Sequence, residues 1–167
     1  MNGRGEMTMA RFHFQGIDEY AAKLYALSDQ SETMIKRAVY DGAKIVIDEI
    51  KSAIAMLPAQ AENPPKGETF TLLEAERDGL IEGAGLSEMK NEKGYINTKF
   101  GFAGYNRLKS KKYPKGHPNV MIARAIESGT SFRRKTRFIQ KAAKAATKAA
   151  EAAMAARFDE DTKQIMQ

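Results

Sequence analysis

The stretch Val120–Phe138, VMIARAIESGTSFRRKTRF, and the run KAAKAATKAAEAAMAA that follows at residues 141–156 decide the fold of this chain. Asn119 is a suitable cap for a short helix, and Gly129 is the residue type that most often stands just past a helix end. A polar loop and a group of cations then lead into a long helix. We therefore predict two helices joined by a turn, in which Gly129 supplies a left-handed backbone geometry that other residues enter only at a cost.

The N-terminal third has the strongest helical pattern of the chain. Asp29 and Glu32 have the spacing of a capping box, and Pro58 predicts the end of the helix because it cannot donate a backbone hydrogen bond. Behind the box, apolar residues recur at spacings of three and four: Ile35, Val39, Gly42, Val46, Ile50, Ala53 and Leu57. This stripe predicts a core-facing side. A separate short helix is expected before it, capped by Asp18, with Ala21, Leu24 and Leu27 on one face.

The last helix is predicted from Lys135 toward Phe158. Its expected buried side consists mainly of alanines: Phe138, Ala142, Ala145, Ala149, Ala152 and Ala156. Alanine has the highest helix propensity and buries little area, so a second backbone can come close to this side.

Between the long helices, the clearest strand signal is the alternation at residues 95–102, YINTKFGF. Its expected partners are Phe12–Phe14 and the segment Leu86–Met89, because an isolated strand leaves its backbone groups unpaired. Thr71 and Glu74 form a second capping box, which predicts a helix through Leu72 and Leu80 toward Gly83 or Gly85.

These elements predict an α+β fold, in which a long amphipathic N-terminal helix and a long alanine-rich C-terminal helix pack on a small, mainly antiparallel sheet. We expect a loose leader at residues 1–10, a single domain at 11–158 and a C-terminal tail at 159–167. Mobile loops are expected near 59–69, which contains two prolines and a glycine, and near 106–119, which is polar and cationic.

Composition narrows the classes of function. The 167 residues contain no cysteine, which excludes disulfides and thiolate chemistry, and no apolar segment is long enough for a secretion signal or a membrane span. We expect a soluble protein without a membrane partner. The chain carries a net charge of +6, but residues 107–148 contain thirteen Lys or Arg and a single acid, a net of +12, so the remainder carries −6. This polarity suits an acidic partner or attraction between copies.

No motif in the sequence predicts catalysis. His13 and His117 are not at metal-binding spacing from each other or from an acidic cluster, and the patterns of phosphate-binding loops, nucleophile elbows and zinc proteases are absent. Glu32, Asp48 and Glu49 read as solvated helix charges. We therefore predict a protein that is not an enzyme and that uses neither a cofactor nor a metal.

The cations form a pattern of their own. Arg137, Lys141, Lys144 and Lys148 are spaced by four, three and four residues, so they lie along one face of the last helix. With Arg133, Arg134, Lys135, Lys111 and Lys112 they are candidates for contacting DNA phosphates or an acidic partner. The alternative is a solvated face that keeps an alanine helix soluble. No aromatic residues are interleaved, so base stacking is not predicted.

Over Phe12–Met166 the chain resembles tailed-phage morphogenesis proteins, variously described as head-tail joining, tail-completion or minor tail components. The most specific match is Ala125–Ser131, AIESGTS, which fits an apolar-Glu-x-Gly-Thr signature, together with Met121–Arg124 before it and Phe138 after it. Two positions depart from the pattern: Thr136-Arg137 stands where a proline is common before the phenylalanine, and Gly67–Leu72 is only a loose counterpart of a Thr-Gly-Leu motif.

The resemblance implies a structural virion protein that forms a ring, of six copies, at the neck between capsid and tail. It implies contacts with the portal-side connector and with the tail terminator or tube, around a channel for genomic DNA. The protein would be assembled in the cytoplasm of the bacterial host and reside in the virion. The residues expected at the subunit or partner interface are Glu127, Gly129, Thr130, Ser131, Phe132 and Phe138. The alternative function is sequence-independent DNA binding through residues 107–148.

Overall fold

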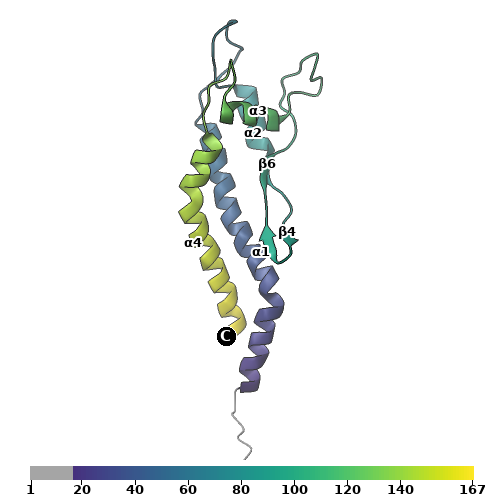
Figure 1. The fold of residues 1–167 in the computed structure, drawn as a ribbon, viewed down its shortest axis with the longest axis vertical. Helices are drawn as coiled ribbons and strands as arrows, with labels where there is room; N and C mark the ends of the chain where they lie inside the picture. Colours follow the sequence, from purple (N-terminus) through teal and green to yellow (C-terminus); the bar gives the residue numbers. More distant parts are fainter. Residues whose placement is uncertain (1–16) are drawn as a thin grey trace, which may run out of the picture.

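The computed structural model describes residues 17–167. Figure 1 shows two long helices lying side by side, with the short helices at one end and a β-hairpin running alongside the middle of the first long helix. The long helices are α1 (Ile17–Ala55) and α4 (Phe138–Met166). The short helices α2 (Glu74–Gly83) and α3 (Asn119–Ser128) lie at the end where α1 finishes and α4 begins. The predicted α+β class, with a long helix toward each end of the chain, is confirmed.

Three two-stranded ladders replace the single small sheet that was expected. Strands β1 (Ala59–Gln60) and β2 (Leu72–Leu73) are parallel. Strands β3 (Ala84–Leu86) and β6 (Phe100–Phe102) are antiparallel, as are β4 (Lys90–Glu92) and β5 (Tyr95–Asn97). Two of the three ladders are therefore antiparallel.

The strand predicted at 95–102 is wrong as one continuous element. The Ser87 N–H still donates to the Lys99 carbonyl at 2.7 Å, but beyond this bond the side chains of Ser87 and Thr98 replace backbone partners. The Oγ of Ser87 accepts a hydrogen bond from the backbone N–H of Lys99 at 3.0 Å, and Thr98 Oγ1 donates to the Ser87 carbonyl at 2.8 Å. The alternation is thus divided between β5 and β6, whose partners β4 and β3 lie on either side of residues 87–89. The other expected partner, Phe12–Phe14, and the predicted leader at 1–10 lie outside the described residues.

Helix α1 is continuous through the boundary that was predicted at Asp29. Glu32 does not cap a new helix; its carboxylate forms an ion pair with Lys36 at 2.6 Å on the surface of α1. No glycine or proline occurs between Ile17 and Asp41, so nothing local stops the helix. Its end at Ala55 is close to the end predicted from Pro58.

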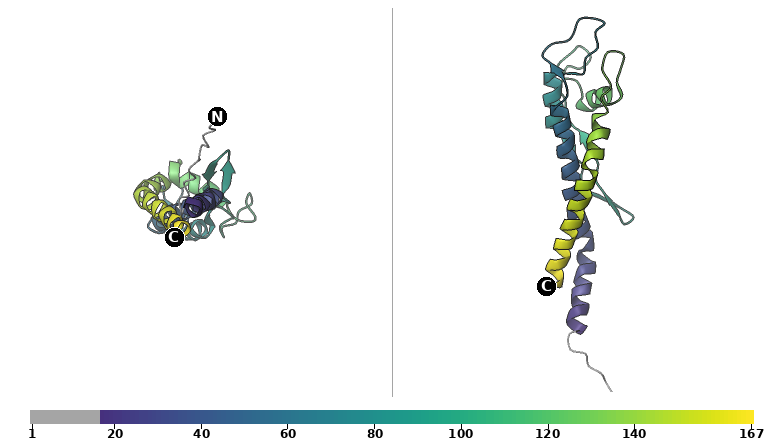
Figure 2. Two further views of the ribbon diagram at one scale, coloured as in Figure 1. Left: turned by 90° about the horizontal axis from the view of Figure 1, so that it is seen from below. Right: turned by 90° about the vertical axis from the view of Figure 1, so that its left-hand side faces the viewer.

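The two long helices approach each other along rows of residues spaced by four. On α1 the row is Met34, Ala38, Gly42, Val46, Ile50 and Ile54, all buried except the half-buried Val46, and on α4 it is Phe138, Ala142, Ala146 and Ala150. A methyl group built on Gly42 would lie only 2.5 Å from Met154 Cγ and 3.2 Å from the Ala150 carbonyl oxygen. Rows of spacing four pack into each other's grooves, and these small residues allow the close approach that Figure 2 shows where the helices cross.

The predicted buried stripes are therefore partly wrong. On α4 the alanines expected inside at 145, 149, 152 and 156 are exposed, and on α1 Ile35 is 39% exposed. A period of 3.6 was assumed for both helices, whereas each contact row advances by four residues and drifts around its helix. Helix α4 also continues through the predicted tail at 159–167, to Met166.

The starts of the short helices differ from prediction as well. Helix α2 begins at Glu74 rather than at the Thr71 box, because Leu72–Leu73 pair with β1. The Asn119 side chain does not cap α3; its amide donates to the Ala103 carbonyl at 2.8 Å. Gly129 ends α3 with a φ of 79°, as predicted.

The main core lies where the short helices meet α1 and α4. It contains Ile50, Ile54, Leu72, Leu80, Ile122, Ile126 and Phe138. We call this end the head, comprising α2, α3 and segments 59–73, 103–118 and 129–137. The opposite end is the foot, comprising residues 17–32 of α1 and 158–167 of α4. At the foot α1 extends past α4, whose last carbonyls accept hydrogen bonds from Lys23 (Figure 1). Among residues 17–167, no helix combines the length and the apolar character that crossing a membrane requires.

Candidate functional site

The turn after α3 is held by its own backbone and by Thr130. The N–H of Thr130 donates to the Arg133 carbonyl at 3.0 Å, and the N–H of Arg133 donates to Thr130 Oγ1 at 3.0 Å. Gly129 has φ 79° and ψ 159°, a combination that is essentially restricted to glycine. Ser131 and Phe132 are thereby placed at the exposed tip of the turn, and Phe132 is 52% exposed.

Glu127 connects this turn to the start of α4. Its two carboxylate oxygens accept hydrogen bonds from the backbone N–H groups of Ile139, at 2.9 Å, and Gln140, at 3.2 Å. An acid at this position satisfies donors that have no partner within the helix and interacts favourably with the helix dipole. The structure thus gives Glu127 a role within the chain, and its contact with a second copy stays a prediction.

Two residues of the predicted surfaces are buried. Phe138, predicted at the subunit interface, is 3% exposed and packs in the core against Phe102, so its side chain is not at the surface of the single chain. Arg133, predicted to contact DNA, is 7% exposed and makes two hydrogen bonds to Glu76, at 2.6 and 2.8 Å. The guanidinium also donates to the Thr71 carbonyl at 3.1 Å and lies 4.6 Å from the centre of the Phe70 ring. Arg133 is therefore unavailable to phosphates.

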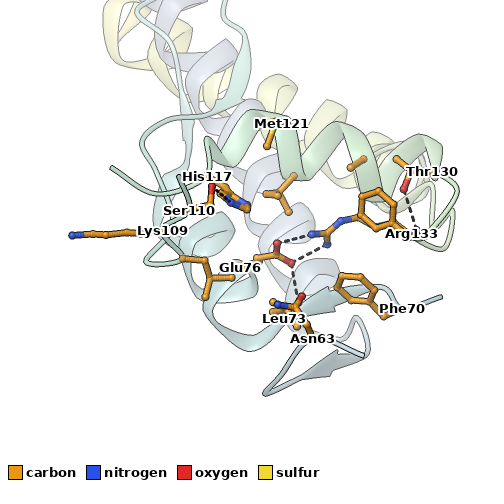
Figure 3. A pocket seen from close by; sticks show the side chains of 14 residues that line it. Asn63, Phe70, Leu73, Glu76, Lys109, Ser110, His117, Met121, Thr130 and Arg133 are labelled. Carbon is orange, nitrogen blue, oxygen red and sulfur yellow. Dashed lines mark hydrogen bonds and ion pairs between the residues drawn. The ribbon is translucent and has the colours of Figure 1, made fainter. Parts of the chain in front are cut away.

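A hollow of about 560 Å³ opens beside this ion pair, and Figure 3 shows the side chains around it. The buried pair Glu76–Arg133 lies at its floor, and the apolar lining includes Phe70, Leu73, Leu108, Met121, Ile122, Ala125 and Phe132. Asn63, Lys109, Ser110, His117 and Thr130 add polar groups. Two residues of the predicted interface, Thr130 and Phe132, thus line one hollow. Its volume is in the range of sites that hold a ligand or a few side chains.

The segment 106–118, on the other side of the hollow, is folded around Asn106. The side-chain oxygen of Asn106 accepts hydrogen bonds from the N–H groups of Leu108, at 3.0 Å, and His117, at 3.1 Å. His117 Nε2 lies 3.3 Å from Ser110 Oγ, and its ring packs edge-on against Tyr113. The Lys111 and Lys112 side chains are exposed on this segment. The predicted mobility of this loop stays a prediction.

Sequence reasoning missed both Glu76 and Asn106. Glu76 reads as one of several acids on an amphipathic helix, and its burial depends on an arginine 57 positions away. For Asn106 and Asn119 the available signal was the surrounding glycines. A methyl group on Gly79 would lie 2.9 Å from Asn119 Oδ1, and one on Gly83 would lie 2.6 Å from Asn119 Nδ2. Glycines on α2 thus allow the asparagines to approach it.

The remaining predicted cations are all exposed, and we call them together the α4 ridge: Arg134 and Lys135 on the segment before α4, Arg137 at its N-cap, and Lys141, Lys144 and Lys148 on α4. Along the helix, Arg137 and Lys148 are separated by about 16 Å at 1.5 Å per residue. In the part of the chain that the structure describes, none of the six takes part in an ion pair. Over the same residues there is no group of three or more His, Cys, Asp or Glu that could hold a metal.

Comparisons with protein-family models, with curated proteins and with solved structures found no match to this chain. The physical case for its function therefore rests on two features of the head and the adjoining part of α4: the apolar hollow beside an exposed aromatic turn, and the exposed basic ridge.

Proposed function

We propose that this chain is a structural adaptor of a tailed phage or prophage, which joins head and tail at the neck by assembling with copies of itself. The observation that carries the proposal is the turn at 129–132. The apolar-Glu-x-Gly-Thr stretch, from which the resemblance was drawn, folds into a rigid turn that presents Phe132 at its tip beside the hollow. A large aromatic side chain held 52% exposed next to an apolar concavity is typical of a surface that a protein partner covers.

The local energetics support an assembly role. The turn is fixed by the Thr130 hydrogen bonds and by the glycine-restricted geometry of Gly129, so little conformational entropy would be lost when a partner binds. The partners under this proposal are further copies in a ring of six, the portal-side connector and the tail terminator or tube. The place of action is the virion neck, after assembly in the host bacterium.

The direct test is the composition of tailed particles from cells that carry the gene. Mass spectrometry of purified particles is expected to detect the chain, and gold-labelled antibodies are expected to mark the junction of head and tail. Particles that lack the chain, or labelling confined to another part of the particle, would refute the proposal.

A second function is favoured by the α4 ridge, whose cations could lie along a phosphate backbone and bind DNA without sequence preference. If Arg137, Lys141, Lys144 and Lys148 each neutralise one phosphate, affinity should fall roughly a hundredfold between 50 and 200 mM salt. Fluorescence anisotropy with an arbitrary 30-base-pair duplex measures this dependence. Changing Lys141→Gln and Lys144→Gln together should reduce the slope of log affinity against log salt by about two.

The matched control for the ridge changes two exposed lysines, Lys90→Gln in β4 together with Lys99→Gln between β5 and β6. This control removes the same charge from a surface outside the ridge. Equal loss of affinity in both variants would mean that only net charge matters, and the ridge would not be a binding site. Absence of binding at 50 mM salt would remove the second function altogether.

A further inference from the structure

The head and the foot of this molecule are complementary in charge. The head as a whole contains twelve Lys or Arg and seven Asp or Glu, a net of +5. Nine of these cations and none of the acids lie in segments 103–118 and 129–137, and two of the nine, Arg107 and Arg133, are paired with Glu82 and Glu76 of α2.

At the foot, residues 17–32 and 158–167 contain seven Asp or Glu and two Lys, a net of −5. Three of these acids are paired within the chain: Asp161 is buried beside Arg37 and Arg157, Glu160 also pairs with Arg157, and Glu32 pairs with Lys36. Opposite charge at the two ends of an elongated molecule favours approach of one copy's head to another copy's foot.

The two ends also complement each other in apolar surface. The hollow provides an apolar concavity at the head. At the foot, the first turns of α1 expose large side chains: Tyr20 is 57%, Leu24 44% and Tyr25 78% exposed. Tyr20 and Leu24 are four residues apart, so they lie on the same side of α1 within about 6 Å of each other. Asp18 and Glu19 immediately precede them.

The chain's own foot cannot reach this hollow. Helix α1 has 39 residues and is therefore about 58 Å long, and it separates the hollow from Tyr20 of the same chain. Figure 2 shows the head and the start of α1 at opposite ends of the molecule. The foot that enters a hollow must therefore come from another molecule.

We propose that the head of one copy binds the first turns of α1 of a second copy, with Tyr20 and Leu24 entering the hollow. Asp18 and Glu19 then face the cations of segments 103–118 and 129–137. This contact rests on the proposed self-assembling function and specifies which surfaces of neighbouring copies meet. It is a head-to-tail interface, which closes into a ring or continues into a filament according to the rotation between copies.

Residues 61–70, which form one side of the hollow, restrict the orientation of the foot. This side carries Glu62 and Glu68 and one cation, Lys66, whereas the segment with Lys109 is free of acids. The acids of the foot are therefore expected beside Lys109 and away from Glu68. A foot helix in the reverse orientation would bring acids together, and like charges at short range oppose binding.

The contact is expected to be weak between two isolated copies. The free energy gained by burying one tyrosine and one leucine only slightly exceeds the cost of the entropy that is lost on association, so we expect a dissociation constant on the order of tens of micromolar or higher. Sedimentation velocity of the full chain at 0.05–1 mM protein, in low salt, is the appropriate measurement.

The test uses two variants, one with its foot blocked and the other with its head blocked. Tyr20→Ser with Leu24→Ser blocks the foot, and Lys109→Glu with Phe132→Asp blocks the head; all four positions are exposed, so circular dichroism and Tm should match the parent. The parent is expected to associate, with at least a tenfold lower association constant in each variant. An equimolar mixture of the two variants is expected to form a 1:1 dimer and nothing larger, because only one productive pair of ends remains.

Chemical cross-linking locates the contact, since the chain has no cysteine of its own. A copy with Leu24→Cys and a copy with Ser110→Cys are mixed with a short bismaleimide and should form a covalent heterodimer. The matched control replaces Ser110→Cys by Met56→Cys, at a position that is 84% exposed and outside the hollow. Equal yields with Met56→Cys would overturn the proposed contact.

Three further results would overturn it: a monomeric parent at 1 mM, undiminished association of either blocked variant, or a monomeric mixture. None of them bears on the particle composition that tests the neck function. Chains that occur at the neck but continue to associate when both ends are blocked would show lateral assembly, with the adaptor function intact.

Discussion

Removing both members of the buried pair Glu76–Arg133 should destabilise the fold by much less than the sum of the two single removals. Glu76 is 1% exposed and Arg133 7% exposed, and two hydrogen bonds of 2.6 and 2.8 Å join them. Arg133→Met leaves a buried carboxylate whose remaining hydrogen bond comes from the Leu73 N–H at 2.9 Å. Glu76→Leu leaves a buried guanidinium whose remaining hydrogen bond goes to the Thr71 carbonyl. An uncompensated buried charge costs about 3–5 kcal/mol.

In the double variant no buried charge remains. The Leu73 N–H and the Thr71 carbonyl lose their side-chain partners, which costs roughly 1–3 kcal/mol in total if the backbone relaxes. The two single changes should therefore sum to about 6–10 kcal/mol, and the double should cost several kcal/mol less than that sum.

Urea unfolding followed by circular dichroism measures these differences, since the chain is rich in helix and has no tryptophan for fluorescence. In a thermal melt, each single variant should lose roughly 6–20 °C in Tm, at about 2–4 °C per kcal/mol for a chain of this size. The matched control is Arg107→Met, which removes an ion pair with Glu82 of 3.9 Å whose side chains are 79% and 73% exposed. Its cost should stay below about 1 kcal/mol.

Additive single and double variants would refute the reasoning, because they would mean that the two charges do not compensate each other. Single variants no more costly than the Arg107→Met control would show that water reaches the pair.

Four further predictions follow from single positions. Gly129→Ala should cost about 1–3 kcal/mol in urea unfolding, because φ 79° with ψ 159° is strained for a residue with a Cβ. Glu127→Ala should lower the free energy of unfolding by about 1–2 kcal/mol, because it removes the acceptor for two N–H groups at the start of α4. A variant as helical and as stable as the parent would contradict that role. Gly42→Leu should cost about 1–3 kcal/mol or more by forcing α1 and α4 apart, measured in the same way, and an unchanged midpoint would show that the helices are not in close contact. The pKa of Glu32 should lie below its ordinary value, because Lys36 donates a hydrogen bond to the carboxylate and supplies positive charge, with a smaller contribution from a hydrogen bond with Asn91 of β4. In an NMR titration of the Lys36→Gln variant the pKa of Glu32 should rise. Any stability that the pair contributes is present above the pKa of the unfolded state and is lost as pH falls through the pKa of the folded state.

The extent to which the sequence predicts this fold depends on how local each signal is. The end of α1 near Pro58 and the end of α3 at Gly129 were predicted because each is decided by a single residue and its neighbours. The boundary at Asp29 was wrong because a capping box can also occur in the middle of a helix, where its acid pairs with Lys36 instead. A capping signal thus permits a helix start without requiring one.

The buried faces of the long helices depend on a partner that the local pattern does not specify. The apolar residues of α1 and the alanines of α4 surround much of each helix, so several stripes fit each pattern. The choice among them is made by rows of spacing four in the other helix, with Gly42 against Met154 at the closest point. Alanine adds to this ambiguity, since it has the same high helix propensity inside and outside.

The cationic run at 132–135, Phe-Arg-Arg-Lys, shows how a candidate site is divided by a distant contact. Phe70 donates its N–H to the Phe132 carbonyl at 3.1 Å, and the Arg134 N–H donates to the Phe70 carbonyl at 2.8 Å, so this run is extended. Successive side chains of an extended segment point to opposite sides. Arg133 therefore points inward to Glu76, while Phe132 and Arg134 remain exposed. The register of one backbone pairing thus determines both the floor of the hollow and the aromatic residue beside it, and a shift of that pairing by one residue would bury Phe132 and leave Glu76 without its partner.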